Sequence, residues 1–202
     1  MNTSRSVQAG HRRRFTPAVA LVATACTLTA CGATTNDTGL GSTSPKPQHL
    51  NLGRPGPAQE ITKYKKTSKF LITPTKVVEG DAADLKELDD QSKYEGQKVA
   101  WVYVKAKNIG HYGINSPLVM SNVGAEANGS AAQPLIIMMG DLSSRPKDCL
   151  GNDGSRELAG EDIWKPGEQR TVCEPYVLPA DAKITSVTYS QGFDNEPLKW
   201  SV

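Results

Sequence analysis

The stretch that decides the fold is Gln97-Lys-Val-Ala-Trp-Val-Tyr-Val-Lys-Ala-Lys107. Successive residues of a β-strand point to opposite sides of the sheet, so an alternating pattern separates two faces. One face is small and aliphatic, and we expect it to point into a core. The other face is aromatic and basic. The aliphatic face consists of Ala100, Val102, Val104 and Ala106, and the opposite face of Val99, Trp101, Tyr103, Lys105 and Lys107.

Other β-rich segments lie on both sides of this strand, separated by turn signals. Residues 69–78 are β-rich, but Pro74 confines them to a sheet edge or to a strand with a break. Residues 81–91 are acidic and predict one short helix. Further strands are predicted over 134–139, 169–178, 184–190 and 197–202. Many short strands with Gly/Pro turns predict an all-β fold, a β-sandwich formed by residues 63–202.

Three groups of residues carry a resemblance to a known family. They are Val102-Tyr-Val-Lys-Ala-Lys-Asn-Ile-Gly110, the turn Lys165-Pro-Gly-Glu168 ahead of a strand, and Val187-Thr-Tyr-Ser190 before a terminal strand with Trp200. The layout resembles Gram-positive lipoproteins with an immunoglobulin-like (telokin-like) domain of unknown function. The resemblance implies an immunoglobulin-like sandwich. Its motifs describe strands and turns and imply no chemistry.

The N-terminus has the three zones of a secretory signal. Residues 1–14 contain four arginines and no acid, and residues 15–30 are uncharged. The uncharged run of 16 residues is short for a membrane-spanning helix, which needs about 20 apolar residues. We therefore expect residues 1–30 to be a cleaved signal peptide.

The end of this run, Leu28-Thr29-Ala30-Cys31, resembles the lipobox of bacterial lipoproteins. The resemblance implies cleavage between Ala30 and Cys31 and a diacylglyceryl group on the sulfur of Cys31. Two acyl chains give a durable anchor, whereas one chain alone binds membranes marginally. The protein is then expected on the outer face of the cytoplasmic membrane. An ordinary secreted protein with a chance cysteine is the alternative.

The sequence leaves the export route open and predicts the nature of the segment after the anchor. Arg12-Arg13-Arg14-Phe15 fits the twin-arginine pattern and equally a plain basic cluster of the general secretory route. Residues 31–62 are rich in Gly, Pro, Ser, Thr and Asn without an apolar period. Such a composition buries too little apolar surface to offset its ordering entropy, so it predicts a flexible linker.

Charge and cysteine counts bound the chemistry. Removal of residues 1–30 removes four arginines and leaves 19 basic against 21 acidic residues, a net charge of −2. This balance gives no argument for a nucleic-acid partner. Cys149 and Cys173 remain once Cys26 leaves with the signal and Cys31 carries the lipid. An even pair in an oxidising compartment predicts a disulfide that pins a long polar loop to a strand.

Catalytic and metal-binding patterns are weak in the sequence. A nucleophilic triad needs a histidine base, and His111, directly after a turn, is the one candidate in the domain. An acidic run at Asp81, Asp84, Asp89 and Asp90 lacks the spacing of a calcium loop, and a solvated acidic face explains it equally. We therefore predict no enzyme activity, no metal and no cofactor.

Exposed aromatic side chains are the one candidate for a binding surface. Trp101 and Tyr103 share the strand face opposite the aliphatic one, and Trp164 and Trp200 could join them. A platform of Trp101, Tyr103 and Trp164 would stack sugars or bind a protein, whereas ordinary core packing is the alternative.

The sequence thus predicts a non-enzymatic binding or interaction module at the cell envelope. It leaves the ligand open among a protein, a cell-wall glycan and a small molecule. The alternatives are an accessory subunit of a transporter or sensor system and, less favoured, a cell-wall enzyme.

Overall fold

The computed structural model describes residues 49–137, 142–149, 160–192 and 195–202. The sequence predicts strands joined by turns, and the described ranges consist mainly of strands, turns and loops. In chain order the elements are β1 (His49–Asn51), β2 (Gln59–Lys63), β3 (Lys66–Glu79), the 3₁₀ helices η1 (Ala82–Glu87) and η2 (Gln91–Tyr94), β4 (Gln97–Asn108), β5 (Ile114–Asn115), the 3₁₀ helix η3 (Val119–Asn122), β6 (Val123–Ala127), β7 (Ser130–Ala131), β8 (Gln133–Pro134), β9 (Ile163–Trp164), β10 (Gln169–Pro179), β11 (Ile184–Tyr189) and β12 (Leu198–Ser201).

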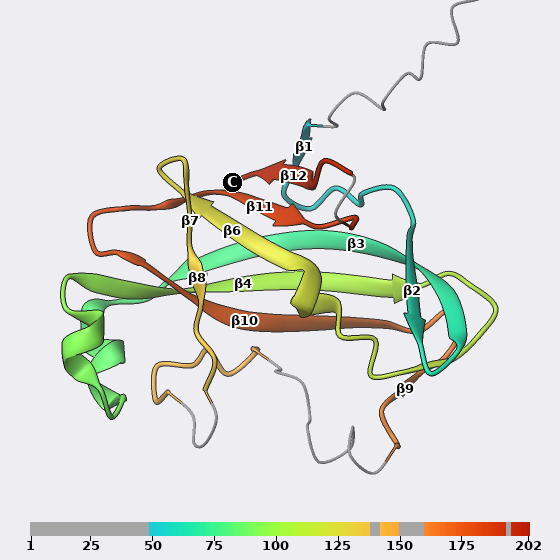
Figure 1. Ribbon diagram of the computed structural model, residues 1–202, viewed down its shortest axis with the longest axis horizontal. Coiled ribbons are helices and arrows are strands. Elements are labelled where there is room, and N and C mark those ends of the chain that lie inside the picture. Colours follow the sequence, from blue (N-terminus) through green and yellow to red (C-terminus); the bar gives the residue numbers. More distant parts are fainter. Residues whose placement is uncertain (1–48, 138–141, 150–159, 193–194) are drawn as a thin grey trace, which may run out of the picture. The chain divides into compact units, whose positions relative to one another are not determined.

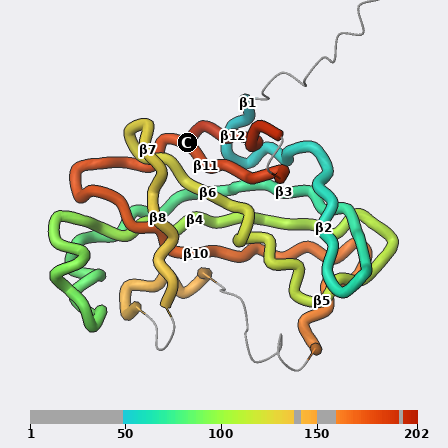
Figure 2. The backbone as a smooth tube through the Cα atoms, in the orientation of Figure 1, coloured from blue at the N-terminus to red at the C-terminus, as the bar shows by residue number. Residues whose placement is uncertain are grey.

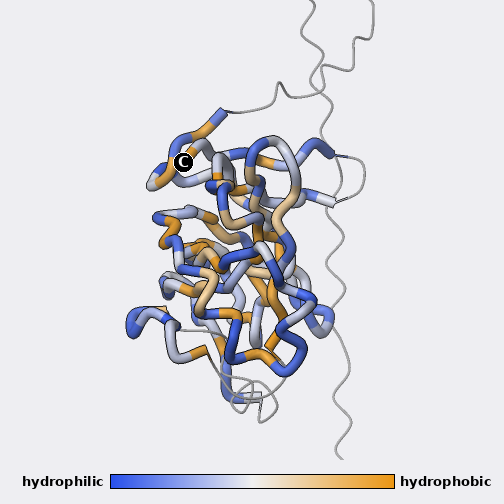
Figure 3. The backbone as a smooth tube through the Cα atoms, turned by 90° about the vertical axis from the view of Figure 1, so that its left-hand side faces the viewer, coloured by the Kyte–Doolittle hydropathy of each residue, from blue (hydrophilic) through white to orange (hydrophobic). Residues whose placement is uncertain are grey.

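The strands form two layers, which confirms the predicted all-β sandwich. One sheet has the order β1-β12-β11-β6-β7 and the other the order β2-β3-β4-β10-β8, while β5 and β9 form a separate pair. Figure 1 shows β3, β4 and β10 side by side as the long strands of one layer, with β6, β11 and β12 in the other. Hydrophobic and hydrophilic segments alternate at short intervals along the tube in Figure 3, as half-buried strands require.

The two faces of β4 have the division that the sequence predicts. The four aliphatic residues from Ala100 to Ala106 belong to the core between the sheets, together with Phe70, Tyr176 and Trp200. Full burial of one valine or leucine side chain contributes roughly 1.5–3 kcal/mol. The opposite face of β4 is also buried for half its length, because Val99, Trp101 and Tyr103 form a second apolar cluster outside the sandwich.

Pro74 sits at a break in β3, one of the two placements predicted for it. The pairing of β3 with β4 shifts register between Pro74 and Lys76, so Thr75 forms a bulge. The pairing of β3 with β2 ends at Phe70, so the missing N–H of Pro74 costs no hydrogen bond on that side.

The predicted linker over residues 31–62 is wrong for its last part. Residues 49–62 contain β1 and β2, and β1 pairs in parallel with β12, with Leu50 opposite Trp200. The indole Nε1 of Trp200 donates to the carbonyl of Arg54 at 2.8 Å, and an added Cβ at Gly56 would lie 2.8 Å from the Trp200 ring. The Gly/Pro-rich composition of this segment predicts disorder. The segment is ordered because it contacts residues far along the chain, in β12. Among the described residues, the fold therefore includes residues 49–62 as well as those from 63 onward.

Two local predictions are modified. The strand expected over 134–139 is limited to Gln133–Pro134 among the described residues, because Leu135 turns into the second apolar cluster. The single helix expected over 81–91 is two 3₁₀ helices, and the side chain of Asp81 caps the first by accepting from the N–H of Ala83 at 2.7 Å. None of the helices in the described ranges is long and apolar enough to cross a membrane.

Candidate functional site

The predicted aromatic platform does not exist as an exposed surface, and this prediction is wrong. Trp101, Tyr103 and Trp164 are 2%, 1% and 3% exposed. Trp101 and Tyr103 lie in the second apolar cluster, whereas Trp164 belongs to the main core and packs against Phe70, with ring centroids 6.1 Å apart. The three rings are therefore ordinary packing residues and share no surface.

The segment after β8 is what covers Trp101 and Tyr103. We call residues 135–137 and 142–149 the covering segment; its Leu135 and Leu142 pack on these two rings from outside the sheet. Cys149 at its end is bonded to Cys173 of β10, with the Cα atoms 5.4 Å apart, which confirms the predicted disulfide. The disulfide holds a loop over a sheet face, as the sequence predicts.

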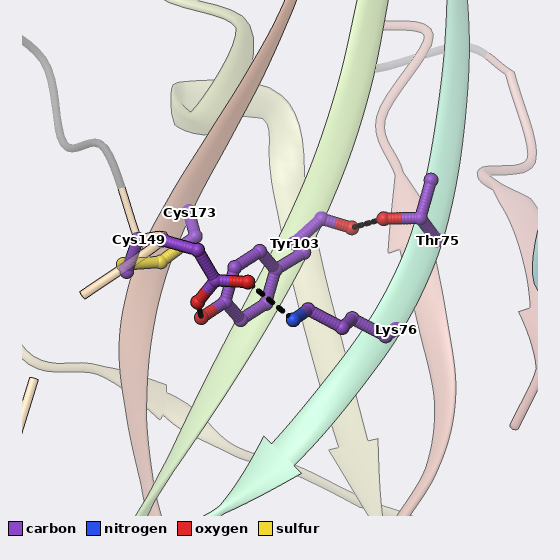
Figure 4. The surroundings of a disulfide bond; sticks show 6 residues. Thr75, Lys76, Tyr103, Cys149 and Cys173 are labelled. Atoms are coloured by element: carbon purple, nitrogen blue, oxygen red, sulfur yellow. Dashed lines mark hydrogen bonds and ion pairs between the residues drawn. A yellow bond between two sulfur atoms is a disulfide. The ribbon is translucent and has the colours of Figure 1, made fainter. Parts of the chain in front are cut away.

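A polar contact reinforces the disulfide (Figure 4). Asp148 accepts hydrogen bonds from Lys76 Nζ at 2.6 Å and from the Tyr103 hydroxyl at 2.8 Å, and the Lys76 ammonium lies 4.2 Å from the Tyr103 ring centroid. Desolvation, and then the hydrogen bond to Asp148, raise the pKa of Tyr103 to about 12. The hydrogen bonds from Lys76 and Tyr103 lower the pKa of Asp148. Both groups keep one protonation state near neutral pH, so the cluster fastens the segment and is unsuited to proton transfer.

Four of the seven exposed large apolar side chains among the described residues lie at one end of the sandwich. Tyr64, Ile109, Tyr112 and Ile163 are 73%, 42%, 61% and 45% exposed. Figure 2 shows the β2–β3 turn, the β4–β5 loop and β5 at this same end. We call these four residues the loop end. The sequence reasoning missed them; the available signal was a large apolar residue next to glycine in a turn, as in Ile109-Gly110 and Tyr112-Gly113.

A single buried residue, Asn108, organises the loop end. Its Oδ1 accepts from Ser68 Oγ at 2.8 Å and from the Gly110 N–H at 3.0 Å, and its Nδ2 donates to the carbonyls of Tyr112 at 2.8 Å and Trp164 at 2.9 Å. All four hydrogen-bonding positions of the amide are therefore used. The backbone of Tyr112 and the neighbour of Ile163 are thus fixed by the same side chain.

The turn after Asn108 and the turn at Lys165-Pro-Gly-Glu168 meet at this point. The N–H of Asn108 donates to the carbonyl of Glu168 at 2.9 Å, and the N–H of Gly167 donates to the carbonyl of Asn108 at 2.8 Å. Arg170 braces the same loop: its guanidinium pairs with Asp162 and with Glu168, and its Cζ lies 4.8 Å from the Trp164 ring centroid. The loop end is consequently held rigidly from beneath while its apolar side chains face solvent.

Charge is distributed unevenly along the strands. Residues 79–98, which include η1 and η2, carry seven carboxylates against three lysines, whereas residues 61–70 carry four lysines and no acid. In the acidic segment, Asp81 and Asp84 are used as caps of η1.

Within the described ranges, no group of three His, Cys, Asp or Glu residues could hold a metal ion. His111 is exposed beside Tyr112. The residues predicted for lipidation and cleavage, Cys31 and Ala30, lie outside the described residues.

Two solved structures are similar in overall layout. MPT63, a secreted protein from Mycobacterium tuberculosis, is 17% identical over 79% of this chain and 100% of its own, with a TM-score of 0.47. A chain described provisionally as a lipoprotein from Staphylococcus aureus is 10% identical over 72% of this chain and 92% of its own, with a TM-score of 0.42. No protein-family model matches the sequence, and no curated protein matches it.

Proposed function

We propose that this protein is a lipid-anchored, extracytoplasmic binding module that performs no catalysis and contacts its partner through the loop end. The observation that carries the proposal is the loop end itself: four large apolar side chains stand in solvent on loops that Asn108 and Arg170 fix from below. Exposing such side chains has no benefit for folding, so their grouping indicates a contact surface.

The proposed extracytoplasmic location rests on two features of the chain. The N-terminal zones and the lipobox-like Leu28-Thr29-Ala30-Cys31 favour export and an acyl anchor on Cys31. The bond between Cys149 and Cys173 is of the type that persists outside the reducing cytosol. An anchored immunoglobulin-like sandwich would hold its loops within reach of other envelope components.

The chemistry of the loop end favours binding. Tyrosines supply a large amphipathic contact area at a low cost in side-chain entropy, and sandwich domains commonly bind through loops at one end. The carboxylates whose pKa is lowered all accept hydrogen bonds that stabilise the fold; they are Glu87, Glu126, Asp148 and Glu168. Among the described residues, apolar contact area is thus the main feature that the loop end offers to a partner. This favours a protein partner, as in an accessory subunit of a transporter or sensor system, over a cell-wall glycan.

Site-specific photo-crosslinking in cells tests the proposal. A photo-crosslinking amino acid replaces Tyr112 in the full, anchored chain, and the matched control replaces Ile136, which is 79% exposed but lies in the covering segment. We expect a discrete membrane-protein adduct from position 112 and none from position 136. The same adducts from both positions, or none from position 112, would contradict the assignment of the loop end. Adducts with wall material alone would favour the glycan.

The anchor is tested in the same cells with the Cys31→Ala variant. We expect this variant to lose acyl labelling and membrane retention and to lose the adduct at position 112. Continued acylation of the variant would overturn the anchor while leaving the loop-end result intact.

A further inference from the structure

The outer face of the β2-β3-β4-β10-β8 sheet is divided into two halves. The covering segment closes the half that contains Trp101 and Tyr103. The other half, toward the loop end, remains open and forms a shallow groove of about 160 Å³. One wall of the groove is a loop held to β3 by the hydrogen bonds Gly53 N–H to Pro74 O and Gly56 N–H to Ile72 O, at 2.8 and 2.9 Å. The groove is lined by Gly53, Pro55, Leu71, Thr73, Lys105, Lys107 and Gln169.

Strand register arranges the lining in two rows across the sheet. Lys107 of β4 lies between Leu71 of β3 and Gln169 of β10, and Lys105 lies between Thr73 and Thr171 in the next row. The two lysines are two residues apart on the same strand, so they share a face and their Cα atoms are about 7 Å apart. The groove therefore has two cations in line with β4 and hydroxyl and amide groups beside them.

These cations have no intramolecular counter-charge in the part of the chain that the structure describes. Other lysines of the domain do: Lys76 pairs with Asp148 at 2.6 Å and Lys98 with Glu79 at 3.1 Å. The side chains of Lys105 and Lys107 form no hydrogen bond or ion pair within the described ranges. The same holds for the exposed side chain of Arg54, which stands between the two wall residues Gly53 and Pro55. On a mature chain with a net charge of −2, this is a local concentration of free positive charge.

We infer that this groove binds a linear phosphodiester polymer lying along β4, with successive phosphates on Lys105 and Lys107. Phosphates separated by a three-carbon spacer recur at about the same interval as the Cα atoms of the two lysines, roughly 7 Å. The Thr73 hydroxyl and the Gln169 amide offer hydrogen bonds to the ester or hydroxyl oxygens.

The shape of the groove favours a polymer over two other polyanions. A bilayer surface is flat, whereas the cations line a recess between the 53–55 wall and the open sheet face. The lining residues include no aromatic ring, so the groove offers no stacking platform for nucleobases. The inference goes beyond the proposed function, because the groove and the loop end are separate sets of residues.

A binding titration tests the inference. The mature chain with Cys31→Ser is titrated against a fluorescent oligomer of propane-1,3-diol phosphodiesters, and anisotropy is recorded over a range of salt concentrations. The test variant is Lys105→Gln with Lys107→Gln. The control is Lys65→Gln with Lys66→Gln, which removes equal charge from two exposed lysines of the β2–β3 turn. Thermal unfolding of both variants checks that the fold is retained.

We expect the test variant to bind about thirtyfold more weakly than the parent chain, because it loses two lysine–phosphate contacts that are each worth about 1 kcal/mol. Its salt slope should fall by about 1.4, or about 0.7 for each lost contact to a single strand. The control should change affinity by less than about twofold. Equal losses in both variants, no binding by the parent chain, or preferential binding to phosphatidylglycerol vesicles would each overturn the inference.

Discussion

At the scale of single residues, Asn108 is the position on which the loop end depends. Its amide side chain is fully buried and makes two hydrogen bonds as an acceptor and two as a donor. Asparagine is needed because the two acceptors face an N–H and a hydroxyl while the two donors face carbonyls. The sequence indicated a turn at Asn108-Ile109-Gly110, but a turn signal cannot reveal partners as distant as Ser68 and Trp164.

Asn108→Asp should destabilise the fold by about 3 kcal/mol or more, because a buried carboxylate would face the carbonyls of Tyr112 and Trp164 without a donor. Urea unfolding followed by circular dichroism measures this as a lower midpoint with an unchanged slope. Asn128→Asp, at an exposed turn position, is the control and should unfold like the parent chain. A small effect at position 108 would show that the loop end does not depend on this amide.

At the scale of elements, the covering segment explains why the aromatic residues of β4 are buried from solvent. The alternation in residues 97–107 predicted which side chains share a face, and that was right. Whether a face meets solvent depends on what lies over it, and Leu142 and Cys149 are about 40 residues further along the chain. Trp101 and Tyr103 were therefore assigned to the correct face and wrongly to the surface.

Replacing both disulfide cysteines, Cys149→Ala with Cys173→Ala, should loosen the covering segment. The chain-entropy model gives a loss of about 3 kcal/mol for a loop of this length, closed here over a sequence separation of 24. Acrylamide quenching should reach Trp101 more readily, since Trp164 and Trp200 remain in the core between the sheets.

Asp148→Ala is the matched control for the disulfide variant. It removes the polar contact to Lys76 and Tyr103 and keeps the covalent one, so Trp101 should stay shielded. If quenching is unchanged in the double cysteine variant, the leucine contacts alone are sufficient to hold the segment.

At the scale of the whole molecule, the sandwich was predictable and its first strands were not. Short alternating segments identify strands locally, and the small aliphatic side of β4 identifies the core side. Residues 49–62 have no such pattern, because their order comes from the parallel pairing with β12 and from the ring of Trp200. The candidate site was missed for a similar reason: the loop end and the groove exist only after distant turns and strands come together.

The packing of the two sheets contains one carboxylate that works against it. Glu174 of β10 lies on the same strand face as Val172 and Tyr176, which belong to the core between the sheets. The Glu174 side chain has no hydrogen-bond or ion-pair partner in the described ranges. Desolvation raises the pKa of Glu174. Desolvation also raises the pKa of Tyr176, and the negative charge of Glu174 raises it further. Folding therefore shifts the Glu174 carboxyl toward its neutral form.

Glu174→Gln should therefore raise the thermal unfolding midpoint at pH 7. A raised folded-state pKa means that the unfolded chain ionises first as pH rises, so the parent chain loses stability from about pH 4.3, the ordinary pKa of glutamate, up through the folded pKa. The advantage of the variant should be greatest above that window and should vanish near pH 3, where the carboxyl is protonated in both states. Glu196→Gln, an exposed site, is the control and should shift the midpoint little at either pH. An advantage of equal size at pH 3 and pH 7 would show that the variant acts through packing, since only an ionisation cost depends on pH in this way.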